Sequence, residues 1–311
     1  MSLSEFSLIQ NYFSKQSLIN PVNRMGIGDD CCLITVPEGY ELAITTDTMV
    51  EGVHFFAGTD PKLLGHKLLA VNLSDLAAMG ASPVSIMLAL TLPKVNESWL
   101  ASFSEGLFDL AKQYSVDLIG GDTTSGALTL TIQALGLVEK GRGLLRSAAK
   151  TGDLIFVTGS LGDAGLGLKI EKGYDCKSPQ RALNRFHRPE PRVKEGLAIR
   201  DYTNACIDLS DGIASDLRHI INKSQVGASL DWEKLPLSNE VKEYIKVTDD
   251  WQLPLIAGDD YELCFTVSPD KAELIDIRCT EVGVIENEPG LRIQRFGEIE
   301  NMEIKGFEHF S

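Results

Sequence analysis

Residues 61–92 read PKLLGHKLLAVNLSDLAAMGASPVSIMLALTL and contain a predicted helix followed directly by a predicted strand. Apolar side chains at Leu64, Leu68 and Val71 recur at helical spacing, and Gly80 is a typical helix stop. The run VSIMLALTL (84–92) is continuously apolar apart from Ser85 and Thr91, as expected of a buried strand. A long helix next to a buried strand indicates a mixed α/β fold class.

The sequence on both sides continues this alternation of strands and helices. Apolar patterns predict strands in CLITV (32–36), ELAIT (41–45) and ALTLTIQALGLV (127–138). They predict an opening helix containing Phe6, Ile9 and Phe13, and a long helix from about Trp99 to Tyr114. This first α/β region ends near Glu139.

A Gly-rich and basic junction, EKGRGLLRSAAKTGD (139–153), separates this region from a second α/β region. Predicted strands there are LIFVTG (154–159), ACIDL (205–209) and YELCFTV (261–267), with helices around 180–200 and from about Asp211. A chain of 311 residues is near the length at which one core divides into two. We expect an N-terminal domain over residues 1–140 and a C-terminal domain over residues 141–311.

The composition excludes several functional classes. The chain has 29 Lys and Arg against 44 Asp and Glu, a net charge of −15, so bulk electrostatics do not favour nucleic acid as a partner. No apolar run is long enough to span a membrane, and the N-terminus lacks the pattern of a signal peptide. Six scattered cysteines without a C-x-x-C pair suit a reducing compartment, so we expect a cytoplasmic protein.

Acidic residues are concentrated in five short segments flanked by glycine or placed at strand ends. Each segment alone also fits a turn or a helix cap, which are common places for Asp and Ser. The segments are GIGDD (26–30), TTDTMVEGVHF (45–55), NLSDLAAMGA (72–81), IGGDTTSG (119–126) and IDLSDG (207–212).

Asp75 is the acidic residue that local structure explains least. It lies four residues after Val71 and four before Met79, on the stripe that its helix otherwise buries. A carboxylate there must be paired, hydrogen-bonded or bound to a cation, and position alone does not decide which.

Strand alternation places further oxygens together. Thr45 and Asp47 point to the same side of their strand, as do Asp208 and Ser210. Carboxylates that converge without a metal raise one another's pKa values, whereas Mg²⁺ prefers such all-oxygen surroundings. Convergent Asp residues in an acidic chain therefore predict divalent cations.

Standard phosphate and zinc motifs are absent from the sequence. There is no Walker A run, GIGDDC lacks the third glycine of a dinucleotide fingerprint, and the five histidines have no ligand spacing. The segment GSLGDAGLGL (159–168) either offers backbone N–H groups to an anion or forms a tight strand-to-helix turn.

Three further polar residues have two interpretations each. Arg146 lies in the junction, where it could clamp a phosphate or simply be a solvated linker residue. His54 lies in a predicted loop, suited to substrate contact or to an ordinary polar role. Glu262 is expected on the polar face of a strand, a position that assigns it no role.

Taken together and in this order, the motifs resemble those of thiamine-monophosphate kinase. That enzyme is a member of the superfamily that includes aminoimidazole ribonucleotide synthetase and selenophosphate synthetase. The likeness covers nearly the whole chain and includes RPEPR (188–192), AGDDYEL (257–263) and GFEHF (306–310). TTDTMVEGVHF, AGDDYEL and the GFEHF ending favour the thiamine enzyme over its relatives.

The resemblance implies a role for each matching residue. Asp47, Asp122, Arg146 and Asp211 are the implied catalytic residues. The implied ATP contacts are Gly121, Asp122, Arg146 and Ser210, and the implied thiamine-phosphate contacts are His54, Glu262 and Phe307. The implied Mg²⁺ ligands are Asp30, Thr45, Thr46, Asp47, Asp75, Asp122, Asp208 and Asp211.

The resemblance also implies a fold and a reaction. The N-terminal α/β domain would bind ATP and Mg²⁺ and pair its sheet with a second copy in a homodimer, and the C-terminal α/β domain would complete the cleft. The implied reaction is ATP-dependent phosphorylation of thiamine monophosphate to thiamine diphosphate by direct in-line transfer. The alternatives are another ATP-dependent synthetase of the superfamily and a non-catalytic nucleotide- and metal-binding sensor.

Overall fold

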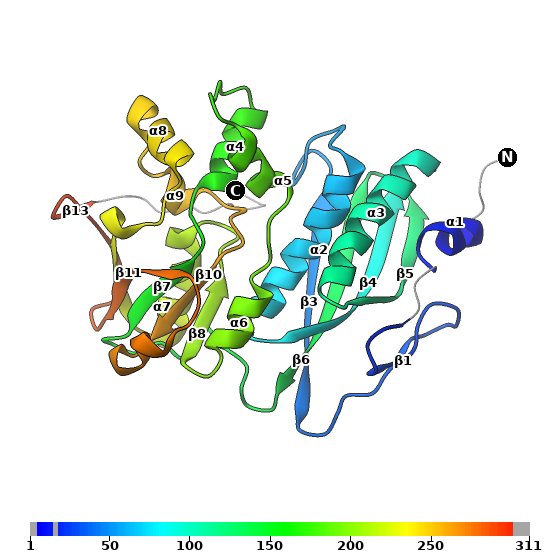
Figure 1. Cartoon of the computed structure of the whole chain (residues 1–311), viewed down its shortest axis with the longest axis horizontal. Helices are drawn as coiled ribbons and strands as arrows, with labels where there is room; N and C mark the ends of the chain where they lie inside the picture. Colours follow the sequence, from blue (N-terminus) through cyan, green and yellow to red (C-terminus); the bar gives the residue numbers. More distant parts are fainter. Residues whose placement is uncertain (1–4, 15–17, 301–311) are drawn as a thin grey trace. The chain divides into compact units, whose positions relative to one another are not determined.

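The computed structural model describes residues 5–14 and 18–300, and its chain divides into two compact units (Figure 1). One unit comprises the chain up to Leu76 together with Ala81–Gly141, and the other comprises Ala77–Gly80 together with the chain from Arg142. Phe307, an implied substrate contact, lies outside the described residues. Both units are mixtures of helices and strands, as the sequence predicted.

The first unit is built on a four-stranded sheet in the order β3-β6-β4-β5. Only β4 and β5 run parallel; the other two pairings are antiparallel. The strands are β3 (Tyr40–Val50), β4 (Ser82–Leu92), β5 (Asp117–Ser125) and β6 (Thr129–Glu139). Beside them are a two-stranded pair, β1 (Asn23–Met25) and β2 (Leu33–Ile34), and the short helix α1 (Glu5–Tyr12).

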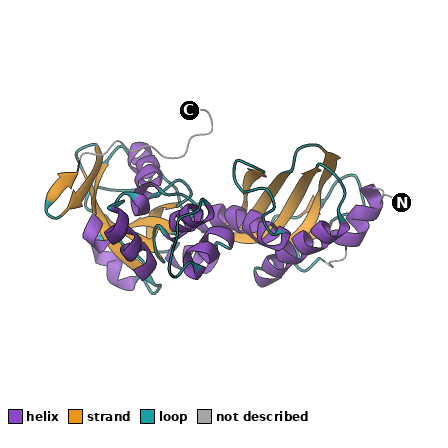
Figure 2. Ribbon diagram, turned by 90° about the horizontal axis from the view of Figure 1, so that it is seen from above, coloured by secondary structure: helices purple, strands orange, loops and turns teal. Residues whose placement is uncertain are grey.

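Two long helices, α2 (Pro61–Ala78) and α3 (Glu97–Gln113), lie on the same face of this sheet (Figure 2). The predicted helix and strand of residues 61–92 correspond to α2 and β4. In α2, Leu68, Leu69 and Leu73 are completely buried. On the other face of the sheet, Thr46, Thr48 and Gln133 are exposed.

Helices α2 and α3 approach closely because each places a glycine at their crossing. A Cβ atom added to Gly106 would lie 1.9 Å from the carbonyl oxygen of Lys62, and one added to Gly65 would lie 2.1 Å from that of Phe103. Backbone thus meets backbone at this contact, which fixes the position of the helix that carries Asn72 and Asp75.

The second unit is built on a seven-stranded mixed sheet in the order β13-β12-β9-β11-β7-β10-β8. Only β9 and β12 pair in parallel. The strands are β7 (Leu154–Thr158), β8 (Thr203–Asp208), β9 (Gly227–Asp231), β10 (Leu263–Val267), β11 (Cys279–Glu286), β12 (Gly290–Arg295) and β13 (Glu298–Glu300).

The helices of this unit form two hydrophobic clusters. Helices α7 (Ile213–Ser224) and α9 (Leu253–Ile256) join the main core through Leu217, Ile220 and Leu255. A second cluster contains Leu166, Ala182 and Tyr244. Those residues belong to α4 (Asp163–Glu171), α5 (Gln180–His187) and α8 (Asn239–Thr248), and the short α6 (Val193–Ile199) follows α5.

The Gly-rich segment 159–168 forms the turn from β7 into α4. The N–H groups of Gly162 and Ala164 donate to the Asp260 carboxyl group at 2.8 and 3.4 Å. An internal acidic side chain therefore occupies the helix N-terminus. Of the two interpretations of this segment, the structure supports the tight turn.

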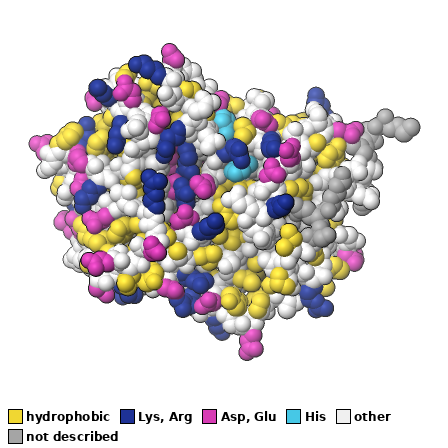
Figure 3. All heavy atoms as spheres, viewed as in Figure 1, with side chains coloured by type: hydrophobic (Ala, Val, Ile, Leu, Met, Phe, Trp, Pro, Cys, Tyr) yellow, Lys and Arg dark blue, Asp and Glu magenta, His cyan; other side chains and the backbone are white. Residues whose placement is uncertain are grey.

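Charged side chains of both signs cover the surface. On the face drawn in Figure 3, Lys and Arg side chains are interspersed with Asp and Glu. Within the described ranges, every helix is too short or too polar to cross a bilayer.

Replacing Gly106 with Ala should lower the free energy of unfolding by about 2 kcal/mol, because the added methyl group has no space between α2 and α3. Urea denaturation of the whole chain measures this change. Gly120→Ala is the matched control, since the nearest atom to its added Cβ is Met87 Cε at 3.5 Å. Equal stability of the two variants would contradict the close helix crossing.

Replacing Asp260 with Asn should remove a pH dependence of stability. Burial, the largest cause, raises the pKa of Asp260 from 3.8 to about 8. Between these values the unfolded side chain is ionised and the folded one holds its proton, so stability falls as pH rises, by up to about 1.4 kcal/mol per unit. Above the pKa of Asp260 in the folded protein, the free energy of unfolding no longer falls as pH rises.

Asn resembles the protonated acid and has no such titration. Denaturation between about pH 5 and pH 7.5 should therefore show wild type losing stability relative to Asp260→Asn as pH rises. A constant difference between the two proteins would contradict a protonated Asp260.

Candidate functional site

Two carboxylates, from β3 and α2, come together in the first unit. The hydroxyl of Thr45 donates to the Asp75 carboxylate, and the Asp47 backbone N–H donates to Asn72 Oδ1 at 3.2 Å. Burial, and next the neighbouring charge of Asp75, raise the pKa of Asp47 to about 6. Asp75 is therefore both hydrogen-bonded and paired with a second acid, which is the arrangement that a bound cation would relieve.

Strand alternation holds for Thr45 and Asp47, which lie on the helix-covered side of β3. Thr46 lies on the opposite side, where its hydroxyl accepts from Gln133 Nε2 at 3.5 Å. The hydroxyl of Thr46 thus points away from the Asp47–Asp75 pair.

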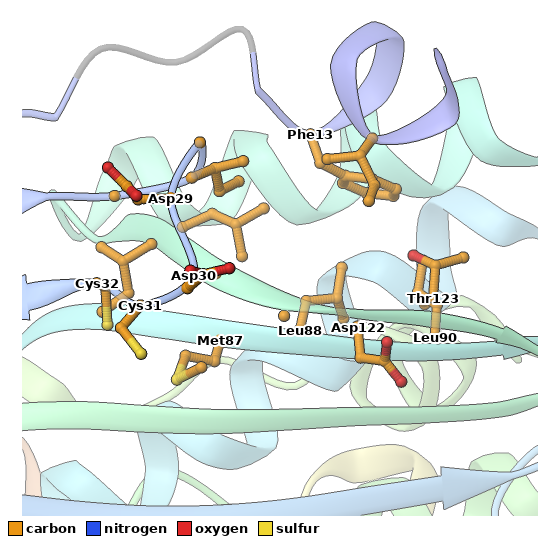
Figure 4. A pocket seen from close by; sticks show the side chains of 18 residues that line it. Phe13, Asp29, Asp30, Cys31, Cys32, Met87, Leu88, Leu90, Asp122 and Thr123 are labelled. Carbon is orange, nitrogen blue, oxygen red and sulfur yellow. The ribbon is translucent and has the colours of Figure 1, made fainter. Parts of the chain in front are cut away.

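A cavity of about 500 Å³ lies between α1, the segment 26–32 and strands β4 and β5 (Figure 4). Phe13, Leu88 and Leu118 give it apolar walls, and Asp30 and Asp122 give it negative charge. An apolar cavity with a few polar groups at its edge is a typical site for a small molecule.

Gly121 lines the same cavity, and only glycine fits there. A Cβ atom on Gly121 would lie 1.8 Å from the carbonyl oxygen of Leu88 on the paired strand. The missing side chain lets β5 lie close to β4 and leaves its backbone open to the cavity beside Asp122.

His54 lies in the turn after β3. Its Nδ1 atom accepts from the Val50 backbone N–H at 3.0 Å, which assigns the proton of the neutral ring to Nε2. The ring is half-buried and therefore held in one orientation.

A second acidic group lies in the other unit, where β8 ends and α7 begins. Asp208 is the last residue of β8, and the Asp211 N–H donates to Asp216 Oδ2 at 3.0 Å. Burial is the largest cause that raises the pKa of Asp216 to about 8; the hydrogen bond from the Asp211 N–H lowers it, the charges of Asp211 and Asp208 raise it, and Arg146 lowers it. These electrostatic effects place Asp208, Asp211, Asp216 and Arg146 near one another.

Asp216 is a residue that the sequence analysis missed. It is 2% exposed and lies on α7 three residues after Ile213 and four before Ile220, both buried. That is the same signal, an acid on a buried helical stripe, that singled out Asp75.

Glu262 does not lie on the polar face of a strand, and that prediction was wrong. Strand β10 begins at the next residue and is buried along its whole length, and Glu262 itself is 0% exposed. Its carboxylate accepts hydrogen bonds from Thr158, Arg185 and Arg192. The acidic residue of this segment that is partly exposed and bonded to Ser210 is Asp259, whose N–H donates to the Ser210 carbonyl at 2.9 Å.

The structure thus gathers the expected residues in separate places. Thr45, Asp47 and Asp75 lie together, and Asp30, Gly121 and Asp122 surround the cavity. Arg146, Asp208, Ser210 and Asp211 lie at the β8–α7 turn of the second unit. Over residues 5–14 and 18–300, no three His, Cys, Asp or Glu side chains form a ready metal cage.

Two protein-family matches cover most of the chain. Residues 28–138 match the AIR synthase related protein, N-terminal domain, and residues 150–295 match the corresponding C-terminal domain.

Full-length relatives and solved structures identify one family among the AIR synthase related proteins. The chain is 45% identical to thiamine-monophosphate kinase of Escherichia coli K12, an alignment that covers 100% of this chain and 99% of the relative. The crystal structure of thiamine-monophosphate kinase from Stenotrophomonas maltophilia has a TM-score of 0.85 and 40% identity, and covers 96% of this chain and 99% of that one.

A structure described as AaThiL complexed with AMPPCP and TMP has a TM-score of 0.80 and 30% identity, and covers 100% of this chain and 99% of that one. On these matches, the chain belongs to the thiamine-monophosphate kinase family of AIR synthase related proteins.

Proposed function

We propose that this chain phosphorylates thiamine monophosphate to thiamine diphosphate, with ATP as the phosphoryl donor. Relatives named for this activity align with it from end to end, and one similar structure is a complex with AMPPCP and TMP. The structural observation that carries the proposal is the Asp47–Asp75 pair, two acids held together in a protein that must bring two phosphate groups into contact.

Charge repulsion is the main obstacle to such a reaction. At about 4 Å, each pair of like charges costs roughly 4 kcal/mol at an effective dielectric of 20. The chain has a net charge of −15, so its overall charge does not attract two polyanions. Arg146 is the cation placed beside the Asp208–Asp211 turn, and a planar guanidinium can bind a phosphate through two hydrogen bonds.

The acidic residues fit Mg²⁺, which favours hard oxygen ligands and shares them with substrate phosphates. Burial, and next the charge of Asp75, raise the pKa of Asp47, and a cation bound between the two carboxylates would lower it again. We propose the following Mg²⁺ ligands: Asp30, Thr45, Asp47, Asp75, Asp122, Asp208 and Asp211, with Thr46 able to contribute through its backbone. When bound, Mg²⁺ would neutralise phosphate charge and stabilise the charge that develops during transfer.

The remaining roles are proposed from the motifs that the chain shares with the family. The cavity beside Asp30 and Asp122 takes the base of ATP against Phe13 and Leu118, with Gly121 next to its phosphates. In the second unit, Arg146 and Ser210 are the proposed phosphate contacts, and in the first unit His54 is the proposed contact of the thiamine phosphate. The acceptor phosphate is ionised at neutral pH, so in-line attack needs no strong general base, and the residues assembled are acids and an arginine.

We further propose that the chain acts as a homodimer in the cytoplasm. Helices cover one face of the four-stranded sheet, whereas the other face exposes Thr46, Thr48 and Gln133 (Figure 2). A sheet with one uncovered face that is not strongly charged can pair with its counterpart in a second copy. The six cysteines are free thiols, in keeping with a reducing compartment.

Asp47→Asn should reduce turnover at least about a hundredfold, because it removes a cation ligand at the centre of the charge-neutralising site. The free energy of unfolding should stay equal or rise, since the repulsion with Asp75 is removed. ADP release with thiamine monophosphate present or omitted, and chromatography of the product, measure the activity. The control is Asp109→Asn, an exposed acid on α3.

Near-normal activity of Asp47→Asn would contradict the proposed Mg²⁺ site. ADP release that does not depend on thiamine monophosphate would favour another synthetase of the superfamily. No ADP release under either condition would favour a nucleotide sensor.

Gln133→Arg should convert the homodimer into a monomer. Gln133 is exposed near the middle of the uncovered sheet face, so pairing would bring the two arginines together and leave them repelling each other. Sedimentation velocity measures the change in mass, and Ala101→Arg on the exposed side of α3 is the control. A monomeric wild type, or a Gln133→Arg variant that remains dimeric, would contradict the proposed interface.

A further inference from the structure

The segment Asp259–Glu262 runs beside the turn that follows β8 and is bonded to it through the backbone. The Leu209 N–H donates to the Glu262 carbonyl at 2.8 Å, and the Tyr261 N–H donates to the Leu209 carbonyl at 2.8 Å. The Asp259 N–H then donates to the Ser210 carbonyl at 2.9 Å. These three bonds hold Leu209 and Ser210 in place between Asp208 and Asp211. We propose above that Ser210 contacts nucleotide phosphates and that the two Asp residues bind Mg²⁺.

The segment has an unfavourable backbone conformation. Asp259 and Tyr261 have φ angles of 67° and 49°, in the left-handed region that side chains other than glycine rarely adopt. Their side chains interact with each other, since the Tyr261 hydroxyl donates to Asp259 Oδ1 at 3.0 Å. Such a conformation persists only where the surrounding structure holds it.

The other two residues of the segment, Asp260 and Glu262, hold it in this conformation. Asp260 accepts from the start of α4, and Glu262 is buried with four hydrogen-bond donors. Arg192 donates through Nε to Oε2 at 2.6 Å and through an NH2 nitrogen to Oε1 at 2.7 Å. Arg185 donates to Oε1 at 2.6 Å, and Thr158 donates to Oε2 at 2.6 Å.

Arg185 also donates a hydrogen bond to the backbone of the segment 259–262. The same nitrogen that bonds Glu262 also donates to the backbone carbonyl of Asp260 at 2.7 Å. The side chains of Arg185 and Arg192 are 11% and 15% exposed, so these ion pairs are shielded from water and salt. Removing the carboxylate would break the ion pair of Arg185, whereas Arg192 would keep Glu190 at 3.1 Å and Glu195 at 3.8 Å.

We propose that Glu262 is a positioning residue. Its ion pairs with Arg185 and Arg192 fix the segment 259–262, and the segment holds Asp208, Ser210 and Asp211 in the arrangement that binds the phosphates of the nucleotide. This inference rests on the proposed function and replaces direct contact between Glu262 and the thiamine phosphate.

Glu262→Gln tests the proposal, because Gln keeps the shape and the bond from Thr158 but loses the charge. The KM for ATP should rise at least tenfold, while kcat falls no more than about threefold, since the reacting groups themselves are unchanged. Hydrogen exchange without ligands should become faster in residues 206–212 and 258–264 and stay unchanged in β9 and β12.

The matched control is Glu286→Gln in the same unit. The Glu286 carboxylate also pairs with two nitrogens of one arginine, Nε and Nη2 of Arg292, at 2.6 and 2.5 Å. Glu286 lies in β11, away from the β8–α7 turn. Its KM for ATP should not change. If Glu262→Gln fails to fold, Arg192→Lys is the second variant, because it keeps the positive charge but loses the bidentate hydrogen bonding to Glu262. It should raise the KM for ATP and speed local hydrogen exchange by a smaller factor.

Three results would overturn the proposal. One is an unchanged KM for ATP with unchanged local exchange in Glu262→Gln. Another is faster exchange throughout the unit without a change in KM, which would mark a purely structural role. The third is a raised KM for thiamine monophosphate alone, which would mark a substrate contact. Absence of kinase activity in wild type would refute the proposed function instead, and the exchange comparison would still test the positioning role.

Discussion

The burial of carboxyl groups beside one another is the constraint on which the candidate site of this structure depends. The fold brings Asp75 against Asp47 in one unit and Asp216 against Asp208 and Asp211 in the other, and burial raises the pKa of Asp47 and Asp216. Neither arrangement improves the stability of the isolated chain. The hydrogen bonds that hold the acids in place, and Arg146 in the second unit, offset part of this cost.

The architecture can be predicted where the hydrophobic pattern is long. Helix α2 and strand β4 carry enough apolar residues to be recognised from sequence, and they set the α/β character of the first unit. Strand β5 was not predicted, because GGDTTS (120–125) follows only three residues of strand-like sequence and resembles a loop. Its place is set by pairing with β4, to which Gly121 allows a close approach.

The sequence was sufficient to identify most acidic residues of the candidate site, but not the residues that surround them. Asp75 was recognised because a charge on an apolar stripe is visible in the sequence, and Asp216 could have been recognised by the same signal. Glu262 was misread because its burial depends on Arg185 and Arg192, about 70 residues away in the chain. No local pattern around AGDDYEL reveals partners at that distance.

The raised pKa of Asp47 beside Asp75 has a thermodynamic consequence. With a pKa of about 6, a fraction of the molecules carry a proton on Asp47 near neutral pH. A cation that enters there must displace this proton into the buffer. The heat recorded in a calorimetric titration will therefore vary with the ionisation enthalpy of the buffer chosen, and the slope of that variation counts the protons released.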